Sequence, residues 1–531
     1  MIHRRALLVL AVLIGVWSVR GAEAQAGAAT GEGVLELLDA TQVEEATRML
    51  AGVPASDPLR PLASASLHFH RGRYAEALSA LAAGEPPESH ADRSAYLGTR
   101  ISGAIEGTAG MTEQTEGNFV FRYAPGVDEV LATYAAEALE GQREAMRLLL
   151  GVAPEEPTIV EFFAEKTTFV AASGLPATWV ETTGTVAICK WDRILVLSPM
   201  NMPRGYPWMD TLAHEYVHLA LSRASSNEAP IWFQEGSAKV LESAWRDGDR
   251  RKFSSPYSES LLAKASKADA LIPFDSMHPS MAALPSAQDA TLAFAQVAYA
   301  IDYIFEQAGE KGYRRIVDET RRHGDVLRAT DMVLGSAGGR FEKRYQGHIA
   351  RQALQIRSNV AAFEPTIAAG AASADDTEGK ALDPVLIADR KMQEHSRIGD
   401  LLRLRGRMEA ALLEYRRASS VGPFHSPALA NKQARALRGL GQADEAREVL
   451  AESIELYPEY TPTVTLLAAL AAEAGDDAVA LEMGRQAIRL NPFDPNVHEQ
   501  LVAVMERTGD EEGARRERRV LVLLIESTGR R

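Results

Sequence analysis

Residues 211–237 read TLAHEYVHLALSRASSNEAPIWFQEGS, and this stretch decides the fold class. It contains a His-Glu-x-x-His motif and, seventeen residues after the second His, Glu235 within Trp-Phe-Gln-Glu-Gly. On a helix, His214 and His218 lie one turn apart and differ by about 40° around the axis, so both imidazole rings can reach one metal ion. The pattern therefore predicts a helix that supplies two ligands to one ion.

The third ligand is predicted on a second helix. Catalytic zinc takes three protein ligands and keeps one position open, and residues 228–244 form an apparent helix with Glu235 in its first half. The polar residues 222–229 supply a turn that folds this helix back against the first one. Glu215 lies about 100° from His214 around the first helix, so it can lean over the open side of the ion without binding it. The predicted zinc ligands are His214, His218 and Glu235.

Plainer interpretations of these residues stay open at this point. The two histidines can be core residues satisfied by their neighbours, and Glu235 can be an acid on a helix surface. Burying three titratable groups in an otherwise apolar helix is costly unless they have partners, however, and a zinc ion is one such partner. A zinc-binding chain without activity is a further alternative, against which the intact Glu215 argues.

H-E-x-x-H followed by W-x-x-E-G-x-A resembles the gluzincin metallopeptidases, in particular the peptidase MA-like families of bacterial proteins. The likeness extends over about residues 116–350, with strands at NFVFRYA and TIVEFFA and an edge-strand region at 185–197 before the two helices. It implies an α+β zincin-like peptidase domain, a protein or peptide substrate that adds to the edge strand, and Glu215 as the general base. Glu242 also matches an acidic position that is common in the family pattern.

The chain departs from this family where an oxyanion donor is expected. Phe294 stands where relatives often carry Tyr, and Val297 stands where they often carry Ser. The candidates for the donor are Tyr299, which we favour slightly, and Tyr303, His278 and His323. A Gly-x-Met-Glu-Asn-type motif, which the aminopeptidase branch uses to bind the free amine, is absent from the sequence, so an endopeptidase is expected.

The C-terminal part of the chain repeats with a period of about 34 residues. The recurring positions are Gly406, Gly441, Gly475 and Gly509, then Ala411, Ala446, Ala480 and Ala514, and finally Pro423, Pro458 and Pro492. A turn Gly, a packing Ala and a terminal Pro at this period resemble tetratricopeptide (TPR) repeats, which bind protein partners. We predict an all-α TPR solenoid over 385–531 and a related helical segment over 25–107, which together flank a peptidase domain over 112–362.

The remaining features of the sequence bear on location and on excluded functions. The first 24 residues have a basic start, an apolar run and an Ala-x-Ala ending, which is typical of a secretory signal, and residues 363–384 have a linker composition. The net charge of −15 argues against nucleic acid as a partner. The single cysteine, Cys189, lies in an apolar run and favours a bacterial periplasmic or secreted protein without disulfides. No stable membrane insertion is expected.

Taken together, these features predict an exported zinc endopeptidase whose TPR array recruits a substrate or partner. The alternative is a scaffold or assembly protein of the cell envelope, in which the array binds partners and the peptidase domain is vestigial.

Overall fold

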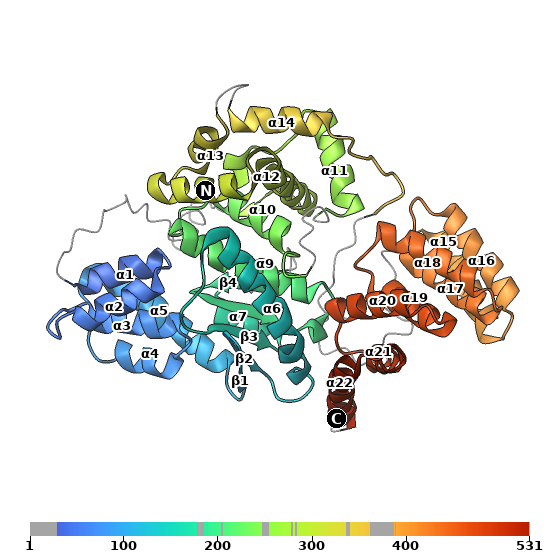
Figure 1. The fold of residues 1–531 in the computed structure, drawn as a ribbon, viewed down its shortest axis with the longest axis horizontal. Helices are drawn as coiled ribbons and strands as arrows, with labels where there is room; N and C mark the ends of the chain where they lie inside the picture. Colours follow the sequence, from blue (N-terminus) through green and yellow to red (C-terminus); the bar gives the residue numbers. More distant parts are fainter. Residues whose placement is uncertain are drawn as a thin grey trace, which may run out of the picture.

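The computed structural model is mostly helical, with one small mixed sheet and a series of helical hairpins (Figure 1). The predicted secretory signal, the predicted linker at 363–384 and His278 lie outside the described residues. The structure describes residues 29–177, 180, 185–202, 205–246, 254–277, 280–281, 284–335, 340–361, 387 and 389–529.

Five helices form the N-terminal segment, which is α-helical as predicted. They are α1 (Gly31–Asp39), α2 (Val43–Gly52), α3 (Arg60–His70), α4 (Tyr74–Leu81) and α5 (Ala91–Gly107). Gly72 turns the chain between α3 and α4 with φ of 59°, and Ala77 is fully buried where these two helices pack. The segment has its own apolar core and contacts the sheet through Phe69, whose ring lies 4.6 Å from the guanidinium of the buried Arg193.

The sheet has five strands in the order β1-β2-β3-β5-β4. The central strands run parallel and each edge strand is antiparallel to its neighbour, with Phe119 opposite Thr158, Ile159 opposite Arg193 and Ala187 opposite Val196. Every residue of β3 is buried, as expected for a central strand that is covered on both faces. The strands are β1 (Thr112–Glu116), β2 (Phe119–Tyr123), β3 (Thr158–Phe163), β4 (Ala187–Lys190) and β5 (Arg193–Leu197).

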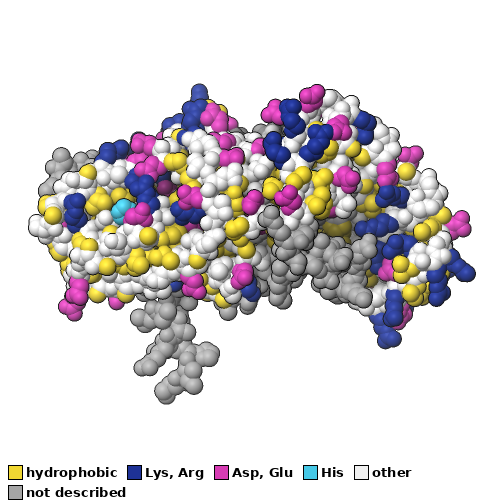
Figure 2. Space-filling model, turned by 90° about the horizontal axis from the view of Figure 1, so that it is seen from below, with side chains coloured by type: hydrophobic (Ala, Val, Ile, Leu, Met, Phe, Trp, Pro, Cys, Tyr) yellow, Lys and Arg dark blue, Asp and Glu magenta, His cyan; other side chains and the backbone are white. Residues whose placement is uncertain are grey.

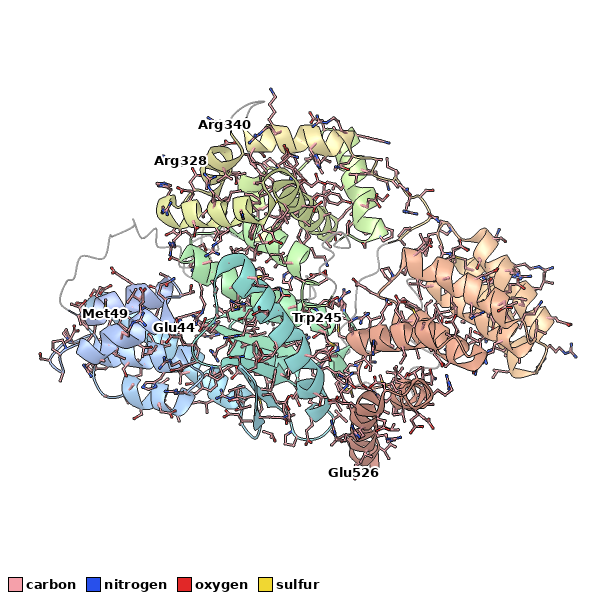
Figure 3. All side chains as sticks on the ribbon, viewed as in Figure 1. Glu44, Met49, Trp245, Arg328, Arg340 and Glu526 are labelled. Atoms are coloured by element: carbon pink, nitrogen blue, oxygen red, sulfur yellow. The ribbon has the colours of Figure 1, made fainter. Side chains whose placement is uncertain are left out.

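The predicted edge-strand region 185–197 is a hairpin. Of its two strands only β4 lies at an edge of the sheet, because the chain turns at Trp191 and Asp192 and returns as the interior strand β5. Both turn residues have positive φ, of 54° and 60°, as tight two-residue hairpins require. The turn is held by Arg223, whose guanidinium contacts the carboxylates of Asp192 and Glu44. Glu44 belongs to the N-terminal segment (Figure 3).

Helices cover both faces of the sheet. Helix α6 (Glu129–Leu150) lies with α9 (Trp208–Ser225) over the face that carries Phe119, Val160 and Phe162, whereas α7 (Lys166–Ser173) packs on the opposite face against Phe163 and Leu195. The further helices of this region are α10 (Ile231–Leu241), α11 (Pro256–Lys267), α12 (Ala287–His323), α13 (Val326–Leu334) and α14 (Phe341–Arg351), with the short 3-10 helices η2 (Pro199–Asn201) and η3 (Phe274–Met277). A further 3-10 helix, η1 (Glu88–His90), precedes α5 in the N-terminal segment. Helix α12 is broken at Gly309, which has φ of 63° and ψ of −175°.

Eight C-terminal helices form four successive hairpins, which we call the hairpin array (residues 390–529). The repeated glycines have φ between 71° and 80° at the turn within each hairpin, and the four repeated alanines are buried. The repeated prolines follow the second helix of the first three hairpins by two residues. The helices are α15 (Arg390–Leu404), α16 (Met408–Val421), α17 (Pro427–Gly439), α18 (Ala443–Leu456), α19 (Thr461–Ala474), α20 (Asp477–Leu490), α21 (Pro495–Thr508) and α22 (Glu511–Gly529).

The largest apolar core of the structure is continuous from the sheet and its helices into the hairpin array. No helix in the described part of the chain combines the length and the apolar character that crossing a membrane requires. Figure 2 shows acidic and basic side chains mixed with apolar ones over one face of the molecule.

Candidate metal centre

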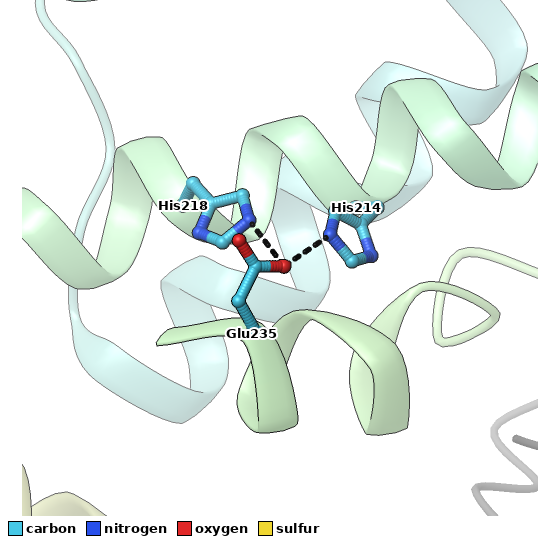
Figure 4. A group of neighbouring side chains, drawn as sticks. All are labelled: His214, His218 and Glu235. Atoms are coloured by element: carbon cyan, nitrogen blue, oxygen red, sulfur yellow. Dashed lines mark hydrogen bonds and ion pairs between the residues drawn. The ribbon is translucent and has the colours of Figure 1, made fainter. Parts of the chain in front are cut away.

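The two predicted helices bring His214, His218 and Glu235 together (Figure 4). Oε2 of Glu235 lies 3.3 Å from Nε2 of His214 and 3.6 Å from Nε2 of His218. One donor atom from each of the three residues lies within 4.8 Å of the others. The three side chains are between 14% and 19% exposed, so the cluster is partly open to solvent.

Local packing explains how the second helix comes to lie beside the first. Ser226 and Asn227 have positive φ, of 51° and 63°, and reverse the chain after α9. Gly236, next to Glu235, sits directly on α12, because a Cβ atom there would lie 2.5 Å from the carbonyl oxygen of Val297. The glycine of the Trp-Phe-Gln-Glu-Gly sequence therefore allows close helix packing, which fixes the position of α10.

Each histidine is oriented by a partner on its other ring nitrogen. Nδ1 of His214 lies 3.2 Å from Oε2 of Glu242, and Nδ1 of His218 lies 3.2 Å from Oε1 of Gln234. Glu242 is itself held by Lys239, whose Nζ lies 2.6 Å from Oε1. In this arrangement both Nε2 atoms face Glu235, and a bonded Nδ1 atom is the usual arrangement of metal-binding histidines. Two imidazoles and one carboxylate are also a ligand set of catalytic zinc, so the residues present fit this ion.

Glu215 is buried beside the cluster and is held by the edge strand. Its Oε2 accepts a hydrogen bond from the backbone N–H of Cys189 at 2.6 Å. Burial raises the pKa of Glu215, and the charges of His218 and His214 oppose this shift. The side chain of Glu215 is thus separate from the three converging donors but next to them, as a general base requires.

The electrostatic field of the cluster favours a cation. Burial lowers the pKa of His214, but its bonds to Glu235 and Glu242 outweigh burial and raise the pKa to about 10. Burial raises the pKa of Glu235, but His218 and His214 outweigh it and hold this pKa well below the ordinary value. An ionised carboxylate therefore faces the two Nε2 atoms.

Tyr299 does not join this cluster. Gly236 of α10 meets Val297 and Ile301 of α12, and Tyr299 lies about 200° around the helix from Val297, on the face away from α10. Burial and the nearby carboxylate of Glu259 raise the pKa of Tyr299, and a hydrogen bond with Ser254 opposes them. Glu259 is part of α11 and Ser254 lies just before this helix, so Tyr299 lies beside α11. This placement argues against the predicted role of Tyr299 as oxyanion donor.

The other described candidates for the oxyanion donor also lie elsewhere. Tyr303 packs against His348, with ring centroids 4.5 Å apart, at the contact between α12 and α14. His323 is exposed at the end of α12 and pairs with Glu319 at 3.3 Å. The structure therefore assigns neither residue to the cluster.

Two residues beside the cluster have roles that sequence reasoning missed. Glu242 was noted only as an acidic position of the family pattern, although its spacing of seven residues from Glu235 places both on one side of α10. Gln234 was not noted, and its contact with His218 depends on the angle at which α10 crosses α9. The only indication in the sequence that Gln234 lies near the cluster is its position directly before Glu235.

Comparisons with known proteins add little to this geometry. No protein-family model matches the chain, and a search of curated proteins found no match. Among solved structures, the native yeast LTA4 hydrolase aligns over 79% of this chain and 67% of its own, with 9% sequence identity and a TM-score of 0.29. A likeness at this TM-score establishes neither a shared fold nor a shared activity.

Proposed function

We propose that this protein is a zinc-dependent peptidase with His214, His218 and Glu235 as the metal ligands and Glu215 as the general base. The observation that carries the proposal is the convergence of two Nε2 atoms and one carboxylate, each histidine being oriented by a bond on its other nitrogen. A pair of ordinary core histidines has no need of acid partners on both sides of His214 (Glu235 and Glu242) and of a third, buried acid beside it.

When bound, zinc supplies Lewis acidity that polarises a carbonyl group and lowers the pKa of water to around 7. Glu215 takes a proton from the attacking water and delivers it to the leaving amine. Its hydrogen bond from Cys189 keeps the carboxylate at the edge of the sheet, close to the histidines. Glu242 and Gln234 hold the imidazole rings in the orientation that leaves both Nε2 atoms free.

The substrate of the proposed peptidase is an extended peptide segment that pairs with β4. This strand lies at the edge of the sheet, next to α9. In an antiparallel pair, the backbone N–H and C=O of one residue both point toward the partner strand, and those of the next residue both point away from it. The carbonyl oxygen of Val186 accepts a hydrogen bond from the N–H of Leu197, on the β5 side, whereas the N–H of Cys189 points away from β5 and donates to Glu215. Ala187 therefore directs its N–H and C=O outward, where an extended peptide can bind them.

The substitution Glu215→Gln tests this function. The amide preserves size but removes the base, so zinc content stays at the wild-type level while cleavage of an unstructured protein falls by about 100-fold or more. A chelator abolishes the wild-type activity, and added zinc restores it. Unaltered cleavage by Glu215→Gln would overturn the proposal.

We further propose that the hairpin array belongs to the TPR class and binds a protein partner or substrate of an exported peptidase. The support is the correspondence between the sequence period, the positive-φ glycines and the buried alanines of successive hairpins. The full-length Glu215→Gln protein, used as bait, retains a bound partner without cleaving it. If that variant also supports every cellular role of the wild type, the protein acts as a scaffold and the peptidase assignment falls.

A further inference from the structure

The hairpin array meets the metal-binding helix at its first turn. The indole N–H of Trp208, the first residue of α9, donates to the carbonyl oxygen of Ile488 at 2.9 Å. The backbone N–H of Tyr206 donates to the carbonyl oxygen of Leu490 at the same distance. Trp208 is fully buried, so the contact lies inside the molecule rather than on its surface.

This contact satisfies groups that a helix end leaves unpaired. The last carbonyls of an α-helix have no partners within the helix, and Ile488 and Leu490 are in the last turn of α20. The segment that leads into α9 supplies the missing donors. Gly205 allows this close approach, because its φ is 70° and a Cβ atom there would lie 2.0 Å from the carbonyl oxygen of Leu490. Backbone thus lies directly against backbone, with no side chain between.

A second junction holds the array against the helix next to α9. Oη of Tyr134, on α6, donates to Oε2 of Glu517 on α22 at 2.8 Å, and Nδ1 of His498 lies 2.7 Å from the same oxygen. The side chains of His498 and Glu517 are completely buried. Removing Glu517 takes away the shared acceptor of Tyr134 and His498, and loss of one partner from a buried ion pair is strongly destabilising. The array is therefore anchored at two separate points.

The array also reaches the side of the cluster that carries Glu242. Glu459, in the loop between α18 and α19, acts electrostatically on Lys239, the residue that holds Glu242 against His214. His214 itself follows Trp208 by six residues in the same helix. Direct contacts at the start of α9 therefore connect the array to His214, and the charge of Glu459 acts on the side of the cluster that carries Lys239.

We propose that the hairpin array is a structural part of the metal centre, in which the end of α20 positions the start of α9 and hence His214. Trp208 and Gly205 are the positioning residues. This inference rests on the proposed metal site, and it extends the role of the array beyond recruitment. A site built on a helix is as precise as the contacts that fix the helix. Loss of a group bonded directly to a metal ligand typically lowers metal affinity by about 10- to 100-fold, so loss of the contact at the start of α9 is expected to act at the lower end of this range.

The test compares zinc affinity with stability in the full-length protein. The variants are Trp208→Phe, which removes the indole N–H, and Gly205→Ala, which pushes the two backbones apart. The control is Tyr345→Phe, which removes a buried hydrogen bond of 2.7 Å between α14 and the carbonyl of Gln296. Zinc dissociation constants are measured by competition with a chromophoric chelator, and the melting temperature of each zinc-free variant is recorded. For Trp208→Phe and Gly205→Ala, the two junction variants, we expect the zinc dissociation constant to rise by about tenfold or more. For the control, we expect it to stay within about twofold of the wild-type value.

The inference is overturned if the junction variants bind zinc within about twofold of the wild type while losing stability like the control. If Gly205→Ala does not fold, Trp208→Phe decides alone, because phenylalanine fills most of the space of the indole. If the wild-type protein binds no zinc, both the proposed function and this inference are wrong. If the wild type binds zinc tightly and the junction variants bind it equally tightly, only the inference is wrong.

Discussion

Nδ1 of His214 lies 3.2 Å from Oε2 of Glu242, on the opposite side of the ring from Glu235. Glu242 thus determines which ring nitrogen of His214 carries the proton and leaves Nε2 available to a metal ion. Such partners of metal-binding histidines typically change metal affinity by about 10- to 100-fold when they are removed. We predict that Glu242→Leu lowers zinc affinity by at least tenfold, measured by chelator competition.

The matched control for Glu242 is Glu228→Leu, a change at a glutamate in the loop between α9 and α10 that is not among the proposed ligands or their partners. We expect zinc affinity within about twofold of the wild type, because the control only removes negative charge from a neighbouring loop. Equal losses in both variants would mean that general charge, rather than the bond to His214, sets the affinity.

Zinc binding is predicted to release protons at neutral pH. Bonds to Glu235 and Glu242 outweigh burial and raise the pKa of His214 to about 10, and Glu235 also helps to raise that of His218. Both rings must be neutral to bind zinc. Zinc therefore displaces at least the His214 proton at pH 7.5, and affinity rises with pH until the pKa of that ring is reached. Calorimetry in buffers of different ionisation enthalpy measures the release, and proton uptake would contradict the account.

The helices that carry the site were predictable from the sequence, whereas the groups around them were not. His214 and His218 share one side of a helix by spacing alone, and a polar turn before Glu235 indicated the return of the second helix. The contact between Glu242 and His214 depends on the crossing of α9 and α10, which spacing does not determine. Tyr299 is one of four candidates for the oxyanion donor that the sequence offers, and the face of α12 on which it lies follows from packing through Gly236.

Elements formed mainly by tertiary contacts were also missed. Strand β1 has the sequence TEQTE, with no apolar alternation, and exists because its backbone pairs with β2. The sequence pattern gives no information on how the array packs against the sheet and its helices, with which it shares one continuous apolar core. Contacts such as that between Trp208 and Ile488 join residues far apart in sequence, so no local pattern indicates them.

The buried junction around Glu517 is predicted to contribute strongly to stability. Glu517→Ala removes the common acceptor of Tyr134 and His498 and is expected to lower the free energy of unfolding by about 3 kcal/mol. The control Glu526→Ala changes an exposed glutamate of the same helix (Figure 3) and is expected to change stability by less than about 0.5 kcal/mol. Denaturant unfolding measures both values, and equal effects would contradict the prediction.

The contribution of Glu517 also has a predicted pH dependence. Burial raises its pKa, but the bonds from His498 and Tyr134 and the charge of Arg516 outweigh burial and lower it. A lowered pKa stabilises the folded state above the unfolded-state value of about 4.3, and this stabilisation is lost as the pH falls through the folded-state pKa. The stability difference between wild type and Glu517→Ala is therefore expected to shrink as the pH falls below about 4.

The most direct test of the metal centre is the zinc content of the purified full-length protein, compared with that of Glu235→Ala. We predict about one zinc per wild-type chain, because three protein ligands converge on one position. Glu235→Ala removes the only carboxylate of this ligand set and is predicted to purify with little or no zinc. A wild-type protein without zinc, or a variant that keeps the full amount, would contradict the account.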